Sequence, residues 1–454
     1  MRVYGIAERL RTILLYEGEL ATVLRGAGIA LIIRVLASAV GYATIIVLAR
    51  WMGSSEYGRY SFAIAWMTLL AYPATLGLSG PVVRFVSQYA AARDWEQVVG
   101  LLKMSSWLAF GCGTGVALIG ILTVLSFKSY LDPGYFAPMI VALAGIPVVA
   151  LALVRSEAIR GLGWLGIAWG PLQLGQPLLL LFVTVAMVFI EQELSATIVV
   201  GASILAYATM LIAQWRVFHA RLGTKIRAKP KINVRLWLGA ALPFVWIYVA
   251  STTLSQSPVI MIGFFLRPHD VAVYSAAAAT SGVVSFLLEA TNALSAPKFA
   301  VLHARERQGE LQTLVTDITR WTFWPSLAVA LILVAFGPTI LRLFGPGFEQ
   351  GSTVLAILTL GQLVNAFTGP VAMLLNMTGH QNVTARVLGI NAILGAGLGR
   401  ALTQIWGIIG TAVAFSAAIV LWNAWLWGLV VRKLEIYPSL LRPCNSSFAG
   451  VGKN

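Results

Sequence analysis

The chain has 454 residues, of which 58% are hydrophobic and only 11% charged, and its mean hydropathy is +0.82. Soluble domains carry roughly 25% charged residues, so this composition excludes a soluble enzyme, a soluble nucleic-acid binder and a disordered protein. The remaining class is a polytopic α-helical membrane protein. Its net charge of +15 either serves to bind a polyanion such as nucleic acid or reflects basic residues gathered on one side of the membrane.

The first 27 residues mix acidic, basic and apolar side chains and lack the order of a cleaved signal peptide. We therefore predict an interfacial helix in residues 1–27. Beyond it, apolar stretches of about 20 residues, the length that crosses a bilayer, predict transmembrane helices. The twelve predicted spans are 28–50, 60–80, 101–127, 136–156, 164–190, 194–215, 236–266, 271–296, 321–344, 352–378, 386–405 and 408–430.

The positive charges predict the orientation of these spans. With the N-terminus inside, 25 of the 32 Lys and Arg residues fall on cytoplasmic segments, six fall outside, and Arg34 lies within the first span. Ten acidic residues fall inside, six fall outside and Glu289 lies within the eighth span, so the whole excess of +15 is cytoplasmic. Cytoplasmic segments of membrane proteins carry such an excess. We therefore predict cytoplasmic termini and no nucleic-acid partner.

The two halves of the chain are similar at a constant offset of 214 residues. Glu56-x-x-x-Tyr60-Ser61 matches Asp270-x-x-x-Tyr274-Ser275, Arg84-Phe85 matches Lys298-Phe299, and Trp107 matches Trp321. Each half holds six predicted spans, an even number, so the halves have the same orientation and predict a parallel repeat of two six-helix lobes. The predicted organisation is an N-terminal helix (1–27), an N-lobe (28–220), a flexible basic linker (221–235), a C-lobe (236–430) and a cytoplasmic tail (431–454).

Motifs for catalysis, nucleotides and metals are absent from the sequence. There is no G-x-x-x-x-G-K-[ST] loop to hold nucleotide phosphates and no H-E-x-x-H metal motif, and the four histidines are scattered near predicted loops. The two cysteines, Cys112 and Cys444, are too few for a disulfide framework. We therefore predict no catalytic residue, no metal and no cofactor, and hence a protein that is not an enzyme.

Three segments carry recognisable placements of glycine and aromatic residues, namely GSSEYGRYS at 53–61, GLSGPVVRF at 77–85 and LLNMTGH at 374–380. They resemble the polysaccharide transporter family of O-antigen and exopolysaccharide flippases, part of the multidrug/oligosaccharidyl-lipid/polysaccharide (MOP) exporter superfamily. The resemblance extends over about residues 25–430. It implies an all-α fold with two six-helix lobes around a central cavity, and transport by alternating access.

The resemblance also implies a substrate and a setting. The substrate is an undecaprenyl-diphosphate-linked oligosaccharide, moved from the cytoplasmic to the periplasmic leaflet of a bacterial inner membrane. The energy source implied is a proton or sodium gradient. The glycan feeds O-antigen, capsule or exopolysaccharide synthesis, and the partners implied are membrane lipid, a polysaccharide polymerase and a chain-length regulator.

Arg34 and Glu289 are the two charged residues that we assign to the membrane, and the other charges within the predicted bounds are assigned to the adjoining loops. A charge there costs at least about 2.5–3.5 kcal/mol and usually faces a bundle interior or a cavity. One hypothesis has Arg34 bind the diphosphate, with Glu289 coupling transport to an ion or pairing with Arg34 between the lobes. The alternative has Arg34 reach the cytoplasmic face, while Glu289 is a neutral, packed acid.

Five further residues are candidates for binding the substrate. Arg84 and Lys298 are repeat-related and lie at the cytoplasmic ends of the second and eighth spans, where they either guide a diphosphate or anchor the helices. Gln173, Gln256 and Asn292 lie within spans and either contact sugar hydroxyls or join helices. Asn292 follows Glu289 by three residues, so the two are predicted to share a helix face.

Two other functions compete with the flippase. A drug or cation antiporter of the same superfamily would place acidic residues in its cavity, yet Glu289 is the only carboxylate within a predicted span. A membrane enzyme or scaffold of polysaccharide assembly would need paired acid and base groups facing the periplasm, where candidates are few and unpaired. The sequence therefore favours the flippase.

Overall fold

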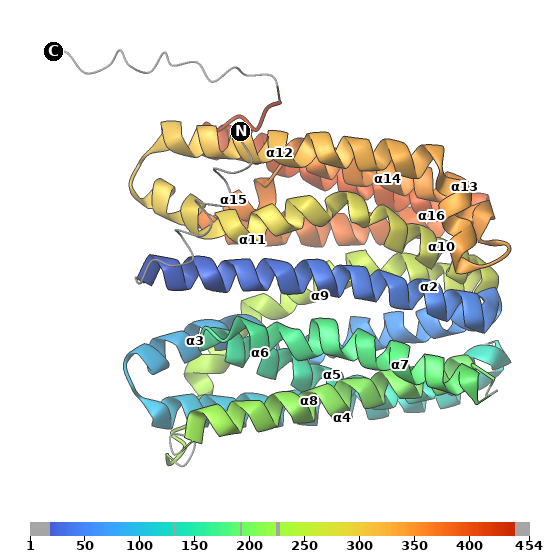
Figure 1. Ribbon diagram of the computed structural model, residues 1–454, viewed down its shortest axis with the longest axis horizontal. Helices are drawn as coiled ribbons and strands as arrows, with labels where there is room; N and C mark the ends of the chain where they lie inside the picture. Colours follow the sequence, from blue (N-terminus) through green and yellow to red (C-terminus); the bar gives the residue numbers. More distant parts are fainter. Residues whose placement is uncertain (1–18, 131, 191–192, 224–227, 441–454) are drawn as a thin grey trace.

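The computed structural model describes residues 19–130, 132–190, 193–223 and 228–440. These residues are predominantly helical, and no strand occurs among them. Most of the long helices run along the longest axis of the molecule (Figure 1). The all-α class predicted from the composition is therefore confirmed. Of the predicted N-terminal interfacial helix, residues 1–18 lie outside the described ranges and residues 19–27 form the start of α2.

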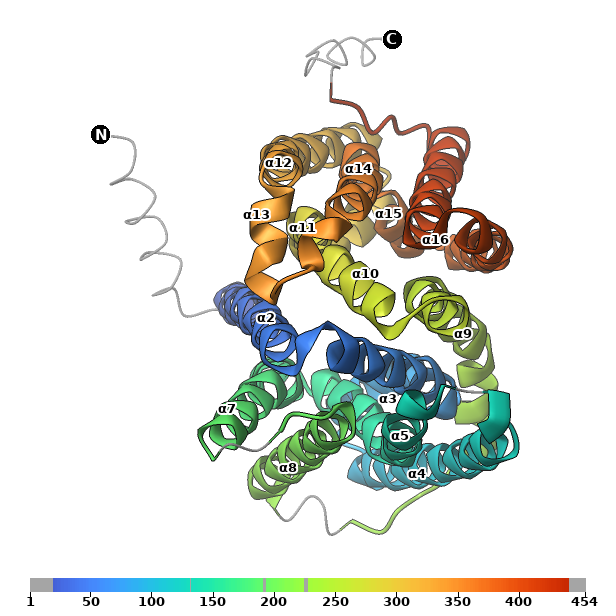
Figure 2. The same cartoon turned by 90° about the vertical axis from the view of Figure 1, so that its right-hand side faces the viewer.

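The helices fall into two groups. The N-lobe contains α2 (Glu19–Ala74), α3 (Ser79–Ala91), α4 (Trp95–Ser126), α5 (Pro133–Gly161), α6 (Leu165–Trp169), α7 (Gln176–Phe189) and α8 (Ala196–Leu222). The C-lobe contains α9 (Val234–Phe265), α10 (Pro268–Ser281), α11 (Val283–Ala304), α12 (Gln308–Ala335), α13 (Gly337–Leu341), α14 (Ser352–Thr368), α15 (Val371–Met377) and α16 (Gln381–Leu434). Seen along the helices, the two lobes meet where α2 and α3 face α9 and α10 (Figure 2).

In the described residues, nine helices are long and apolar enough to cross a membrane, or ten if the bent pair α10–α11 is one span. Two of the nine are interrupted by a glycine with non-helical dihedral angles, Gly53 in α2 (φ 75°, ψ 165°) and Gly407 in α16 (φ 61°, ψ −140°). Glycine adopts positive φ at little cost, so the chain can change direction there. Both glycines lie between two predicted spans, and the count of twelve stays a prediction.

Polar side chains explain where several helices begin. Asp94 accepts a hydrogen bond from the backbone N–H of Gln97 at the start of α4 (3.1 Å), and Asn233 accepts one from Leu236 at the start of α9 (3.3 Å). Such caps satisfy N–H groups that have no partner within the helix. Pro133 opens α5 behind the Asp132 cap, a position where proline loses no helical hydrogen bond.

The parallel repeat predicted from the sequence is visible in the backbone. Arg93 and Glu306, 213 positions apart, both have positive φ (58° and 56°). Arg93 lies in the turn between α3 and α4, and Glu306 lies in the turn between α11 and α12. A left-handed residue at this position ends a helix and redirects the chain. The two lobes thus turn in the same way, at positions that differ by one residue from the 214-residue offset of the sequence repeat.

One end of the molecule, here called the Gly53 end, is sealed by residues of both lobes. Tyr57 of the N-lobe is buried against Phe348 of the C-lobe, with ring centroids 6.3 Å apart, and Phe348 in turn contacts the buried Phe344 at 5.9 Å. A Cβ atom added to Gly58 would lie only 1.8 Å from the carbonyl oxygen of Pro268. The two backbones are thus in direct contact, and only glycine permits this approach.

Helix α5 extends beyond the predicted fourth span, which ends at residue 156, and continues to Gly161, so Glu157 and Arg160 lie on the helix. The chain leaves the helical path only near Gly163, which has φ 78°. The described part of the basic linker contacts α4 at Lys231, whose backbone N–H donates a hydrogen bond to the carbonyl oxygen of Glu96 (3.1 Å).

Candidate functional site

An ion pair joins the two lobes. The Nη2 atom of Arg34 on α2 lies 2.5 Å from the Oε2 atom of Glu289 on α11, and the two side chains are 32% and 58% exposed. Arg34 precedes Gly53 by 19 residues, which is about 28 Å along a helix. The pair therefore lies toward the opposite end of the molecule, here called the terminal end because the described chain starts and finishes there (Figure 1).

The lobes contact each other differently on the other flank of the terminal end. The buried indole of Trp237 on α9 donates a hydrogen bond from Nε1 to the hydroxyl oxygen of Tyr89 on α3 (3.1 Å). Gly77, which has φ +71°, lies against the backbone of Ala241. Figure 2 shows α2 and α11 on one flank and α3 and α9 on the other. One flank is thus joined by a side-chain pair and the other by a buried contact.

The Arg34–Glu289 pair is suited to an interface that moves. A partly exposed ion pair contributes only about 0–1 kcal/mol net, because water screens the charges and the long side chains lose freedom. Separation of the two charges into a water-filled opening is therefore cheap.

Asn292 lies one turn beyond Glu289 on α11. Its Oδ1 atom is buried and has no hydrogen-bond partner among the described residues. A buried amide oxygen without a donor costs about 1–3 kcal/mol, and it is a place where a ligand hydroxyl or a water molecule would be stabilised. Of the predicted site residues, Asn292 is the one with an unused polar atom beside the ion pair.

The other two predicted cations are exposed. The Arg84 guanidinium on α3 lies 5.4 Å from the ring centroid of Phe85. Lys298 on α11 lines a cavity of about 670 Å³ together with Glu310 and Asp317. No described hydrogen bond or ion pair connects Arg84 or Lys298 with Arg34. Lys298 thus shares this cavity with two acidic residues, of which Glu310 is already paired with Arg307.

The two predicted glutamines lie apart from the ion pair. Gln256 on α9 donates a long hydrogen bond from Nε2 to Ser255 Oγ (3.5 Å). Gln173 lies in a π-helical segment, Gly170–Gly175, and lines a cavity of about 450 Å³ inside the N-lobe. The two glutamines therefore lie in different lobes.

The N-lobe cavity contains a carboxylate that sequence reasoning missed. Glu157 lines it together with tyrosines, among them Tyr72 and Tyr207. The carboxylate accepts a hydrogen bond from Arg160 Nε (2.7 Å). The predicted fourth span stopped at residue 156, one position short, and so excluded it. The spacing of Glu157 and Arg160, three residues apart on a continuing helix, was the available signal.

Comparison with known proteins identifies the relatives of this chain. Residues 23–300 match the model of the family described as "Polysaccharide biosynthesis protein", and this range includes the segments 53–61 and 77–85 that carried the resemblance. The probable low-salt glycan biosynthesis flippase Agl15 of Haloferax volcanii is 23% identical over 384 residues, which are 82% of this chain and 75% of that protein.

Solved structures share the fold. The chain is similar to a multidrug resistance MATE family transporter of the MOP superfamily in an inward-facing conformation, with a TM-score of 0.69, 16% identity, and coverage of 88% of this chain and 99% of that one. It is also similar to the lipid II flippase MurJ in an inward closed conformation, with a TM-score of 0.71, 12% identity, and coverage of 90% and 88%. These likenesses confirm the predicted flippase-like fold.

Proposed function

The chain belongs to the polysaccharide biosynthesis protein family, and on that premise we propose that it is a flippase of the MOP superfamily for a polyprenyl-diphosphate-linked oligosaccharide. Its relatives named above are flippases and transporters, not enzymes, in agreement with the prediction from the missing motifs. The glycan relative, Agl15, supports a lipid-linked glycan as the cargo. Transport proceeds by alternating access of the two lobes.

One observation carries this proposal. The lobes are sealed by buried aromatic residues at the Gly53 end, and at the terminal end the partly exposed pair of Arg34 and Glu289 joins one flank. A substrate with a long lipid tail must enter from the side of the bundle while its headgroup passes between the lobes. A weak polar contact on one flank permits such an opening, because it can part without exposing a buried core.

We assign a role in transport to each predicted site residue according to its position in the structure. Arg34, with Arg84 and Lys298 toward the same end, attracts the diphosphate, while Glu289 releases Arg34 when it binds a proton or sodium ion. Asn292, Gln256 and Gln173 supply hydrogen bonds to sugar hydroxyls. The excess of positive charge supports a cytoplasmic terminal end in a bacterial inner membrane. We further propose that the glycan feeds O-antigen, capsule or exopolysaccharide synthesis. A polysaccharide polymerase and a chain-length regulator would then be partners of the flippase.

The proposal is tested with the purified protein in liposomes that carry a fluorescent polyprenyl-diphosphate oligosaccharide. A membrane-impermeant quencher measures how much of the substrate reaches the inner leaflet. We expect transfer to depend on the protein and to be lost in Arg34→Ala. Protein-free liposomes and liposomes with Glu306→Gln, an exposed loop carboxylate outside the site, are the controls. Transfer no faster than in protein-free liposomes would contradict the flippase.

A multidrug antiporter of the same superfamily is the second candidate. The sequence argument against it was that Glu289 is the only carboxylate within a span, but the structure adds Glu157, which lines the aromatic N-lobe cavity. A carboxylate among tyrosines can hold an organic cation. The same liposomes, loaded with ethidium under a proton gradient, distinguish the two, since an antiporter would export the dye and lose this activity in Glu157→Gln.

A further inference from the structure

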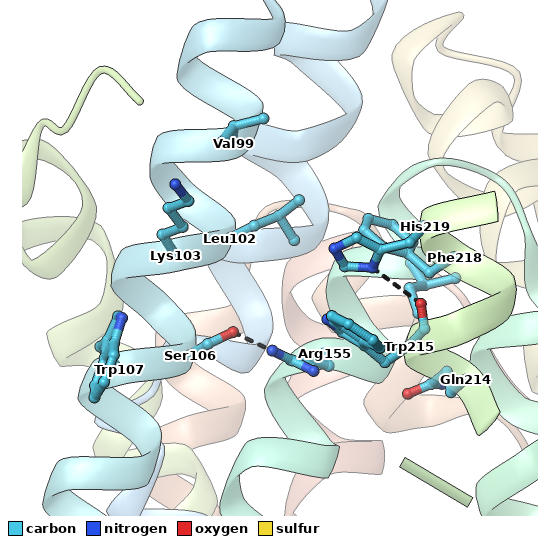
Figure 3. Close-up of a pocket in the computed structure, with 11 residues that line it drawn as sticks. Val99, Leu102, Lys103, Ser106, Trp107, Arg155, Gln214, Trp215, Phe218 and His219 are labelled. Carbon is cyan, nitrogen blue, oxygen red and sulfur yellow. Dashed lines mark hydrogen bonds between the residues drawn. The ribbon is translucent and has the colours of Figure 1, made fainter. Parts of the chain in front are cut away.

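A group of basic residues lies away from the interface between the lobes, on the outer side of the N-lobe. Helices α4 and α8 both pack on α5, and a pocket of about 240 Å³ lies between them (Figure 3). Its polar wall is formed by Lys103 and Ser106 of α4, Arg155 of α5, and Gln214 and His219 of α8. Figure 3 shows the Arg155 guanidinium between Ser106 and Trp215.

The pocket has basic groups and no acidic one. Lys103, Arg155 and His219 line it, and no Asp or Glu is among its lining residues. The Nε atom of Arg155 donates a hydrogen bond to Ser106 Oγ (3.3 Å), and the guanidinium forms no ion pair in the part of the chain that the structure describes. An uncompensated guanidinium on a membrane-spanning helix is costly, and an anion that binds it removes this cost.

The pocket opens on the outer surface of the N-lobe between two exposed tryptophans. Trp107 on α4 is 75% exposed and Trp215 on α8 is 43% exposed, and both line it. The same helices expose apolar side chains farther along toward the Gly53 end, such as Leu118 on α4 and Leu205 on α8. Tryptophan is enriched where the hydrocarbon of a bilayer meets the headgroups. A ligand in this pocket would therefore place its polar group against the cations and its acyl chains along the apolar surface.

The depth of the pocket agrees with this placement. Helix α4 has 32 residues, about 48 Å at 1.5 Å per residue, whereas the hydrocarbon core is about 30 Å thick. If α4 is centred, about 9 Å of it extends into the headgroup layer at each end. Lys103 lies eight residues into α4, about 12 Å from its start, which is close to this boundary.

We propose that this pocket binds the phosphate headgroup of an anionic phospholipid from the leaflet at the terminal end. Its occupant is a resident membrane lipid, so the proposal goes beyond the transported substrate and stands independently of it. The repeat supplies an internal comparison, because Lys103 corresponds to Asp317 and Trp107 to Trp321 in the C-lobe. The C-lobe keeps the tryptophan but has an acid in place of the cation, so only the N-lobe offers this site.

The test measures lipid binding to the full-length protein by native mass spectrometry and thermal unfolding. The protein is placed in phosphatidylcholine nanodiscs with or without phosphatidylglycerol. We expect phosphatidylglycerol to bind and to raise the unfolding temperature. Lys103→Gln and Arg155→Gln should each weaken binding about tenfold, the effect of one lost charge-assisted hydrogen bond. Arg216→Gln removes a charge from the same helix as Trp215 without lining the pocket, and it should bind as the wild type does.

The outcomes decide the proposal. Unchanged binding in both Lys103→Gln and Arg155→Gln would overturn it. Equal weakening in Arg216→Gln would also overturn it, because the attraction would then be a diffuse surface effect. Stabilisation by inorganic phosphate alone, to the same extent as by phosphatidylglycerol, would show that the site takes free anions and no lipid. Should Arg155→Gln fold poorly, Lys103→Gln decides the question, because Lys103 is an exposed side chain.

Discussion

Arg34 on α2 and Glu289 on α11 form an ion pair between the two lobes, with Nη2 and Oε2 2.5 Å apart. The residues are 255 positions apart in the chain, yet both are charges that the predicted spans had placed within the membrane. Their pairing favours the hypothesis of a contact between the lobes over that of two unrelated residues.

The first prediction concerns this pair. Arg34→Ala and Glu289→Gln should each reduce flipping at least about tenfold, because the first removes the charge that attracts the diphosphate and the second removes the carboxylate that releases Arg34. Both variants should reach the membrane at wild-type levels. The exchange of both residues, Arg34→Glu with Glu289→Arg, should restore the contact but not the transport if Arg34 binds the diphosphate. Full activity of either single variant would remove that residue from the mechanism.

A second prediction concerns the Gly53 end. His269 Nδ1 and Ser54 Oγ lie 2.8 Å apart and come from opposite lobes. Cysteines at these two positions, in a chain with Cys112 and Cys444 replaced by serine, should be joined by a short bifunctional thiol reagent. We expect the cross-link to stop flipping. If the reagent contains a disulfide in its linker, a reducing agent should cleave the cross-link and restore flipping. Unimpaired flipping in the cross-linked protein would show that this end need not open.

The third prediction concerns the carboxylate inside the N-lobe. Glu157 and Arg160 are paired and only partly exposed, so Glu157→Gln should lower the stability by about 1–2 kcal/mol by leaving the guanidinium alone. The double variant Glu157→Gln with Arg160→Gln should recover part of this loss, and thermal unfolding in nanodiscs measures both. Additive losses would mean that the pair has no coupling energy.

A fourth prediction compares two glycines. Gly77 has φ +71°, and a Cβ atom there would lie 2.3 Å from the carbonyl oxygen of Ala241. Gly77→Ala should therefore destabilise the protein by about 1–3 kcal/mol. Gly111 lies within α4 with nothing within 4 Å of its added Cβ, so Gly111→Ala should leave the stability unchanged or raise it by up to about 1 kcal/mol. Equal unfolding temperatures for the two variants would contradict the close contact between α9 and Gly77, which lies in the turn before α3.

Much of the fold was predictable because the membrane imposes simple rules. Apolar runs and short loops gave most helices, and the even number of predicted spans in each half gave the parallel repeat. The end of α5 was not predictable to a residue, since Glu157 and Arg160 look like loop residues until their helical contacts are known. That single boundary hid the carboxylate of the N-lobe cavity.

The site was predictable only in part. The rule that charges in spans face an interior singled out Arg34 and Glu289, and the repeat linked Arg84 with Lys298. No sequence rule could show that Lys298 lies beside Glu310 and Asp317, or that Lys103 and Arg155 line one pocket, because these contacts depend on how helices distant in the chain are rotated. Asn292 was singled out by its spacing from Glu289, whereas its unused oxygen is visible only in the structure.

The central claim, that the two ends of the interface open alternately, is tested most directly by distances between spin labels. One pair of labels, at the exposed positions Ser38 on α2 and Val301 on α11, reports on the terminal end. A second pair, at the exposed positions Ser55 and Gln350, reports on the Gly53 end. We predict two distances for each pair, and addition of the lipid-linked oligosaccharide should lengthen one while it shortens the other. A single, unchanged distance for both pairs, or a simultaneous lengthening of both, would contradict the account.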